Sequence, residues 1–468
     1  MAAFLSGAAS ARTSAAQVTT PPESPVTADT GVQAAAPAPV PIPPLSPAQT
    51  AFLVKWVRGV DAQGIGRVVL DDKALTQDAV VQAVLDRAHA LHNGRVDPTD
   101  FLDIWALRPA AYDPRPGLAK AVAEDRLQQW TADQAPPYAG YDGLRQGLQA
   151  YRRIRAEGGW PKLAAGASEA AIRHRLAIED KTGTPGEPLV DAVQRAQRRY
   201  GLKPTGALDA ATLEALNVPV ERRLASIMAN MERWRWMPRE MPVNRVQVNI
   251  AAAVLTVFDG DQPVSSMRAV TGRPGNETPM LVSSIRSIVV NPPWNVPSSI
   301  ARKELLPQGR QTLINKGYRF IATPGGGERL QQAPGPSNSL GRLKFDFDNP
   351  FAVYLHDTPA RGKFASYDRL ASHGCIRLEK PVSLAELMLQ SNPGFSGDVS
   401  GLIDEGKTQR VSLAQPVAVY LLYWTAFAGS NGVLNFRKDP YGWDSLLAAK
   451  IEASRQGGSP TPATTGKP

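Results

Sequence analysis

The sequence Ser372-His373-Gly374-Cys375-Ile376-Arg377-Leu378 contains the only cysteine of the 468-residue chain, directly after a histidine and a glycine. A cysteine attacks as its thiolate, so it needs a base or positive charge nearby and N–H donors for the oxyanion that the attack creates. Gly374 tolerates backbone conformations that a Cβ disfavours, which can aim the N–H groups of Gly374 and Cys375 at one point. A lone cysteine is more often an inert buried residue, so the candidate nucleophile needs support from its neighbours.

Two of the five histidines, His356 and His373, lie close before Cys375, where a Cys–His pair can form. His356 ends an apolar, β-prone run that begins at Phe351, and Thr358-Pro359 then signals a turn. We therefore expect His356 at the end of a strand that faces a cleft. The other histidines lie far upstream: His89, His92 and His174.

The two motifs His356-Asp357-Thr358-Pro359 and Ser372 to Arg377 together resemble the signature of the L,D-transpeptidases, cysteine enzymes that remodel bacterial peptidoglycan. The resemblance implies that Cys375 is the nucleophile, His356 its base, and His373 and Gly374 the residues that shape the pocket. It also implies that Arg377 binds a substrate carboxylate. Many members have Gly or Ser where this chain has Asp357, but a main-chain carbonyl at that position can still orient the imidazole.

The segments Thr278-Pro279 and Asn291 to Pro297 also resemble the L,D-transpeptidase catalytic domain, where such segments lie near the substrate cleft. Trp294 is therefore a candidate substrate-binding residue, with a position in the core as the alternative. Further candidates for substrate binding are Tyr354, two residues before the first motif, and Ser372 and Arg377 in the second motif.

Length and charge restrict the classes of function. The length favours about three domains, and a formal net charge of +9 favours anionic surroundings such as nucleic acid, a lipid surface or an acidic wall polymer. No basic run is interleaved with aromatic residues, so we do not expect nucleic-acid binding. No apolar run is long enough for a transmembrane helix. We expect no cofactor and no metal, because His89 and His92 lack a third ligand and favour a solvated helix face.

Composition and periodicity predict an α+β multidomain protein. A small three-helix module is indicated by Tyr200-Gly201-Leu202, Thr205-Gly206 and Asp209, which resemble a peptidoglycan-binding domain; a helical spacer is the alternative. The β-rich catalytic domain is expected to be mainly antiparallel and sandwich-like, with an insertion that acts as a lid. The predicted parts are a disordered Pro/Ala-rich segment at 1–47, a helical scaffold at 48–165, the peptidoglycan-binding-like domain and linker at 166–243, the catalytic domain at 244–452 with a capping insertion at 298–341, and a disordered tail at 453–468.

The resemblance implies an L,D-transpeptidase that forms a thioester on Cys375 with loss of a terminal D-Ala, then passes the acyl group to a second stem peptide. The implied partners are donor and acceptor stem peptides of peptidoglycan, with carbapenem β-lactams as inhibitors. The implied location is the periplasm or cell envelope of a bacterium, although no complete signal peptide is visible. The alternatives are an L,D-carboxypeptidase or wall-protein-releasing hydrolase of the same fold, and a non-catalytic peptidoglycan-binding scaffold. The scaffold alternative predicts a damaged motif, whereas Cys375, His356 and His373 are intact.

Overall fold

The computed structural model describes residues 39–65, 70–71, 75–180, 182–390, 392–393, 395, 398–429 and 431–456. Most of the two predicted disordered segments lies outside these ranges. Two boundaries differ from the prediction. Ile42 and Leu45 already pack against the first helical cluster, because they can bury apolar surface there, and the last helix runs to Gln456.

The first helices form one hydrophobic cluster. Helix α1 (Pro47–Arg58) begins with a capping box, in which Ser46 Oγ accepts from the Gln49 N–H and the Gln49 side chain accepts from the Ser46 N–H. Helix α2 (Gln77–Asn93) begins after Thr76, whose side chain accepts from the Ala79 N–H. A 3₁₀ turn, Pro98–Asp100, separates α2 from α3 (Arg115–Ala123) and α4 (Leu127–Ala132). Their shared core contains Leu53, Val57, Val80, Val84, Leu118, Val122 and Leu127.

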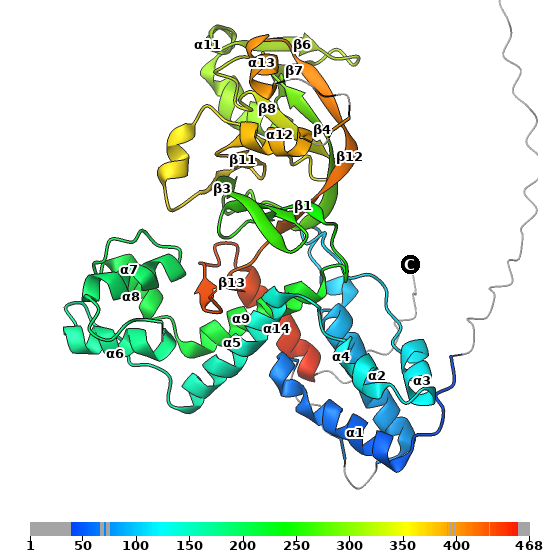
Figure 1. Ribbon diagram of the computed structural model, residues 1–468. Helices are drawn as coiled ribbons and strands as arrows, with labels where there is room; N and C mark the ends of the chain where they lie inside the picture. Colours follow the sequence, from blue (N-terminus) through cyan, green and yellow to red (C-terminus); the bar gives the residue numbers. More distant parts are fainter. Residues whose placement is uncertain are drawn as a thin grey trace, which may run out of the picture. The chain divides into compact units, whose positions relative to one another are not determined.

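The next helices include the predicted three-helix module. Helix α5 (Ala139–Ala156) packs beside α9 (Val220–Arg235) (Figure 1). Between them in sequence come α6 (Glu169–Glu179), α7 (Leu189–Arg199) and α8 (Ala210–Leu216), the last capped by Asp209 as expected. A buried carboxylate, Glu179, ties these helices together. Burial alone would raise the pKa of Glu179, but Arg199 and Arg175 lower it to about 2.

The part predicted to be the catalytic domain is a nine-stranded sheet in the order β10-β3-β11-β9-β8-β4-β12-β1-β2. A further pairing between β2 and β3 closes this sheet on itself, where the sequence predicted a sandwich-like arrangement. Most pairs are antiparallel; β1–β12, β3–β10 and β9–β11 are parallel. The strands are β1 (Asn244–Asn249), β2 (Val254–Asp259), β3 (Gln262–Gly272), β4 (Leu281–Val290), β8 (Leu343–Phe347), β9 (Leu355–His356), β10 (Leu370–Ser372), β11 (Ile376–Leu378) and β12 (Gln409–Leu422).

The closed sheet encloses an apolar core. Alternate side chains of each strand point inward, and residues such as Val246, Val248, Leu255, Phe345, Leu355 and Ile376 are fully buried. Helices α12 (Pro381–Leu389) and α13 (Val399–Asp404) follow β11. The outward-facing side chains of the same strands remain available for a site.

The predicted insertion, 298–341, forms a small unit with its own core, and this unit begins earlier than predicted, at β5 (Trp294–Asn295). It continues with α10 (Ser298–Ile300), the π-helical turn η3 (Ala301–Leu305), the 3₁₀ turn Leu306–Gln308, α11 (Arg310–Asn315), β6 (Tyr318–Ala322) and β7 (Glu328–Gln332). Strands β5, β7 and β6 pair in that order, and Figure 1 shows β6, β7 and α11 together at the top. Its core contains Val296, Ala301, Leu313, Tyr318 and Leu330.

The end of the chain returns to the helices. Strands β13 (Ala426–Ala428) and β14 (Leu434–Phe436) contact α5, and α14 (Trp443–Gln456) packs on α9 (Figure 1). Asp444 of α14 pairs with Arg233 of α9 at 2.6 Å, and both side chains are buried. Residues 426–452, which were predicted to belong to the catalytic domain, therefore pack mainly on the helical part. Within the described residues, none of the helices is both long and apolar enough to cross a membrane.

Candidate active site

The predicted nucleophile and base lie on neighbouring strands and on one face of the sheet. Strands β9 and β11 run parallel, with Leu355 opposite Ile376 and His356 opposite Arg377. Leu355 and Ile376 are fully buried in the core. Because side chains alternate along a strand, His356 and Arg377 point to the outer face. By the same register Tyr354 and Cys375 point outward beside them.

A third strand brings a lysine to this face. Lys344 of β8 lies opposite His356 in the antiparallel pair β8–β9. Its ammonium nitrogen lies 4.3 Å from the centre of the Tyr354 ring and 2.6 Å from Asp346. The outer face around Cys375 therefore carries two cations, Lys344 and Arg377. Lys344 was not singled out by the sequence, since only the strand register shows that it lies opposite His356.

The turn that carries Cys375 is held by local hydrogen bonds. Gly374 has φ of +114°, a conformation that favours glycine. Its N–H donates to Ser372 Oγ at 3.1 Å, and the same hydroxyl donates to the Cys375 carbonyl at 2.5 Å. Ser372 is only 2% exposed. The prediction that Ser372 contacts substrate is therefore corrected: its hydroxyl is used to brace the turn.

The same hydrogen bonds change the expected oxyanion hole. The Gly374 N–H is already donated to Ser372 Oγ, so it is not free in this structure to meet an oxyanion. Thr278 Oγ1 donates to the Gly374 carbonyl at 2.7 Å and fixes the turn from the other side. Of the two predicted donors, this leaves the N–H of Cys375.

Burial and Tyr354 govern the protonation of the nucleophile. Burial raises the pKa of the half-buried Cys375 thiol above its ordinary value. Hydrogen bonds from the main chain and hydroxyl of Tyr354 lower the pKa of the thiol, as do the charges of Lys344 and Arg377, without cancelling the effect of burial. The thiol also lies 3.9 Å from the Ala352 carbonyl oxygen. At neutral pH the sulfur is therefore protonated in the resting protein.

The candidate base is also uncharged at rest. His356 is 4% exposed, and burial, followed by the charge of Arg377, lowers its pKa to about 3. His356 Nδ1 lies 2.5 Å from the Asp357 carbonyl oxygen, so it donates there and the imidazole is oriented as the sequence analysis expects. Among the described residues, the Cys375 sulfur forms hydrogen bonds with Tyr354 and with the Ala352 carbonyl, and none with His356.

Arg377 fits the expected carboxylate contact. Burial lowers the pKa of this half-buried guanidinium. Its buried Nε has no hydrogen-bond partner, and no ion pair joins it to a carboxylate of the described residues. A buried cation without a counter-ion is costly, so an anionic group of a ligand would be stabilised here.

His373 connects the nucleophile turn to the insertion. Its Nε2 lies 2.6 Å from Glu304 Oε1, in the π-helical turn η3, and 3.2 Å from Arg273 just after β3. Arg273 and Glu304 are themselves 3.6 Å apart. Sequence reasoning missed Glu304 and Arg273, because nothing in the order of residues brings them to His373. We call these three residues the clasp.

Trp294 and Tyr354 link the insertion to the sulfur. Trp294 packs on Tyr318 in the insertion, with ring centres 6.4 Å apart. Burial raises the pKa of the Tyr354 hydroxyl well above its ordinary value; its interaction with Cys375 acts in the same direction, and a hydrogen bond with Trp294 opposes it. Trp294 of the insertion is thereby linked to the sulfur through Tyr354.

The two histidines of α2 differ in their surroundings. His89 is exposed, as expected. His92 instead stacks on Tyr112 with ring centres 3.6 Å apart, so the expected solvated face is corrected for this residue.

The chain is similar to known proteins over several segments. Residues 243–407 match a family model described as the L,D-transpeptidase catalytic domain. Residues 174–216 match a model provisionally described as a peptidoglycan binding domain, and residues 72–148 match a scaffold domain. A Haemophilus influenzae protein, provisionally named as an L,D-transpeptidase, is 31% identical over 224 residues, which are 44% of this chain and 45% of that protein. The chain therefore covers less than half the length of this curated relative.

Solved structures show weaker likeness. An L,D-transpeptidase from Stackebrandtia nassauensis is 14% identical with a TM-score of 0.23, covering 54% of this chain and 90% of that chain. L,D-transpeptidase 3 from Mycobacterium tuberculosis, in complex with a faropenem-derived adduct, is 17% identical with a TM-score of 0.21, covering 38% and 60%.

Proposed function

We propose that this chain, which carries an L,D-transpeptidase catalytic domain over residues 243–407, joins stem peptides of peptidoglycan through a thioester on Cys375. The observation that carries the proposal is the common outer face of β9 and β11, where the register places Tyr354, His356, Cys375 and Arg377 together. A nucleophile, a base and an anion-binding cation on adjacent strands match the needs of acyl transfer to and from a peptide.

In the first half of the reaction, Cys375 Sγ attacks the carbonyl carbon that precedes the terminal D-Ala of the donor stem. The thiol proton passes to His356 and then to the leaving amine, and the C–N bond breaks as the C–S bond of the thioester forms. Since both Cys375 and His356 rest uncharged, the proton moves only as attack begins. His356 must approach the sulfur in the substrate complex, because catalytic contacts often close only there.

In the second half, the amine of an acceptor stem attacks the thioester carbonyl. His356 accepts the amine's proton and the thiol is restored as the new amide forms. Water in place of the amine would give hydrolysis, the alternative of the same fold. Arg377 is proposed to hold a carboxylate of the donor, and the Cys375 N–H to stabilise the oxyanion.

The helices are proposed to hold the enzyme on its polymer. The module α6–α8 overlaps the match to a peptidoglycan-binding family, which supports a place in the bacterial cell envelope. The same proposal makes stem peptides the partners and carbapenems the expected covalent inhibitors, because a strained β-lactam carbonyl offers the same nucleophile an acyl group.

The test identifies the products that the full chain forms from purified muropeptides. The protein is incubated with a disaccharide-tetrapeptide, and the products are separated and weighed by mass spectrometry. A dimer that has lost one D-Ala supports transpeptidation; a trimmed monomer alone supports hydrolysis instead. Neither product, with a folded protein, would contradict an enzymatic role on this substrate.

A further inference from the structure

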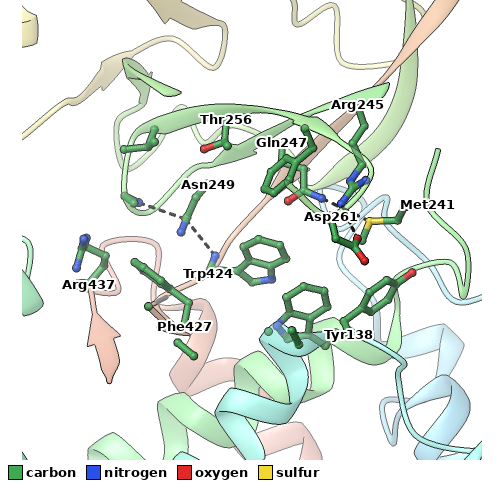
Figure 2. Close-up of a pocket in the computed structure, with 18 residues that line it drawn as sticks. Tyr138, Met241, Arg245, Gln247, Asn249, Thr256, Asp261, Trp424, Phe427 and Arg437 are labelled. Carbon is green, nitrogen blue, oxygen red and sulfur yellow. Dashed lines mark hydrogen bonds and ion pairs between the residues drawn. The ribbon is translucent and has the colours of Figure 1, made fainter. Parts of the chain in front are cut away.

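A cavity lies on the outer face of β1 and β2, apart from the Cys375 site. In the antiparallel pair β1–β2, Arg245 lies opposite Phe258, Gln247 opposite Thr256, and Asn249 opposite Val254. The alternate residues Val246, Val248 and Leu255 are fully buried in the core. The first set therefore faces outward, and it forms one wall of a cavity of about 740 Å³ (Figure 2).

Aromatic rings form the facing wall. Trp234 and Trp424 stack with ring centres 4.6 Å apart and planes 18° apart. Tyr138 packs against Trp234 at 5.2 Å. Figure 2 shows the Trp424 ring standing between the sheet wall and Tyr138. Trp424 is only half-buried, so this cavity has a broad apolar surface on which a flat ligand face can lie.

The sheet wall of the cavity also carries amide side chains. The Asn249 side-chain oxygen accepts from the N–H groups of Ala252 and Trp424, both at 3.3 Å. This leaves the NH₂ group of Asn249 as a donor for a ligand that supplies oxygen acceptors. The amide Gln247 adds a polar group that here contacts only the weak acceptor sulfur of Met241, at 3.4 Å.

Charge in the cavity is partly balanced. Arg245 lies 3.4 Å from the exposed carboxylate of Asp261, and Arg437 donates to the main-chain carbonyls of Arg199 and Phe436. A strongly anionic ligand is therefore not required. A volume in the usual range for small-ligand sites, apolar walls and a few convergent donors together favour an uncharged ligand with flat faces and many oxygens.

The cavity is connected to the nucleophile turn. Strand β3 alone separates β2 from β11 in the sheet. Ala252, which lines the cavity, accepts a hydrogen bond at 3.0 Å from Arg369. Arg369 directly precedes β10, the strand that leads into the Cys375 turn. The cavity and the nucleophile turn therefore belong to neighbouring parts of one closed sheet.

We propose that the cavity binds an N-acetylated amino-sugar unit of the glycan strand whose stem peptide reacts at Cys375. A sugar ring offers flat C–H faces to Trp424, while its hydroxyl and acetamido oxygens accept from the amide groups of Gln247 and Asn249. This assignment rests on the proposed function, since it takes the substrate to be peptidoglycan. With this site, the protein binds stem peptides that are attached to a glycan strand more tightly than free stem peptides.

The test measures binding of a β-1,4-linked N-acetylglucosamine tetrasaccharide to the full chain by calorimetry. Trp424→Ala removes the ring, and Thr256→Trp fills the cavity from the sheet wall; each is expected to weaken binding about tenfold or more. Trp424→Phe keeps a ring and is expected to retain most of the affinity. A maltotetraose of equal length, without acetamido groups, is expected to bind more weakly.

Carbapenem adduct formation on the same samples separates the two proposals. An adduct without tetrasaccharide binding overturns the glycan site while leaving the enzyme proposal intact. Equal affinity of the wild type and Thr256→Trp shows that the sugar binds elsewhere, for instance on α6–α8, and also overturns the site. Binding of a free stem peptide in this cavity, lost in Thr256→Trp, would replace the sugar with a peptide.

Discussion

At the scale of single residues, Tyr354 is the side chain that most directly modifies the candidate nucleophile. Its hydroxyl and main chain both favour the Cys375 thiolate, against the effect of burial. The sequence placed Tyr354 among substrate-binding candidates from its position near His356. Its contact with the sulfur follows from the register of β9 and β11, which sequence patterns do not give.

Tyr354→Phe is expected to raise the pKa of the Cys375 thiol further, because the variant loses a hydrogen bond that stabilises the thiolate. The measurement is the rate of iodoacetamide alkylation of Cys375 against pH, followed by mass spectrometry. Tyr367→Phe is the matched control, since Tyr367 is 50% exposed. Identical pH profiles for Tyr354→Phe and the wild type would show that the Tyr354 hydroxyl does not affect the pKa of the thiol.

His356 makes stability depend on pH. Burial, followed by Arg377, lowers its pKa from 6.5 to about 3 in the folded protein. Between these values the unfolded chain binds more protons, so the free energy of unfolding falls as the pH falls through this window. His92, with a pKa lowered by burial to about 4, acts with the same sign.

His356→Gln cannot titrate, so it lacks this loss of stability. We expect the Tm advantage of the wild type over His356→Gln to narrow as the pH falls from about 7 to about 4. Thermal denaturation of both proteins across this range is the measurement. A Tm difference that stays constant with pH would mean that His356 is not buried in its neutral form.

At the scale of elements, the clasp joins the insertion to the nucleophile turn. A separate insertion before the His356 strand was predicted from its broken strand rhythm, and the structure contains one with its own core. That Glu304 would reach His373, 69 residues away, was not predictable. This contact depends on how the sheet closes, a long-range property that local patterns do not carry.

Glu304→Ala is expected to raise the KM for donor muropeptide by up to about fivefold, the upper range for a partly exposed ion pair. The insertion would then be held less firmly over the cleft. Acylation by a small carbapenem should change less, because it needs fewer contacts. Steady-state kinetics with both substrates provide the measurement.

Glu328→Ala is the matched control for the clasp. Glu328 also lies in the insertion, but it pairs with Arg310 at 2.6 Å within that unit. If Glu304→Ala and Glu328→Ala change the muropeptide KM equally, the clasp has no special role in substrate binding.

At the scale of the whole molecule, the end of the chain supports the active site. The Tyr441 hydroxyl donates to the Gly272 carbonyl at 2.6 Å and accepts from the Thr278 N–H at 3.3 Å. The Thr278 hydroxyl in turn donates a hydrogen bond to the Gly374 carbonyl. A segment anchored on α9 through Asp444 thereby reaches the Cys375 turn.

Tyr441→Phe is expected to slow acylation of Cys375 by about fivefold, as the loss of a single hydrogen bond of about 1 kcal/mol would do. The rate of carbapenem adduct formation is the measurement. Tyr420→Phe is the control, because Tyr420 lies in β12 away from this chain of hydrogen bonds. If Tyr441→Phe and Tyr420→Phe acylate at one rate, the C-terminal segment does not support the turn.

Much of the large-scale organisation was predictable. The α+β class and the resemblance to L,D-transpeptidases are confirmed, because paired motifs and the switch from helical to strand periodicity are local signals. The packing of residues 426–452 on the helices was missed, since the pattern of a strand or helix does not say which element it packs on. The roles of Ser372 and Gly374 were also missed. The Ser372 hydroxyl accepts the Gly374 N–H that the sequence had assigned to the oxyanion hole.

The central claim is that Cys375 forms the acyl-enzyme, and the most direct measurement is intact-protein mass spectrometry with a donor tetrapeptide muropeptide. The account predicts an adduct whose mass corresponds to the donor without its D-Ala, mapped by peptide digestion to Cys375 and absent from Cys375→Ser. An adduct of the same mass on Cys375→Ser, or one mapped to another residue of the wild type, would contradict it.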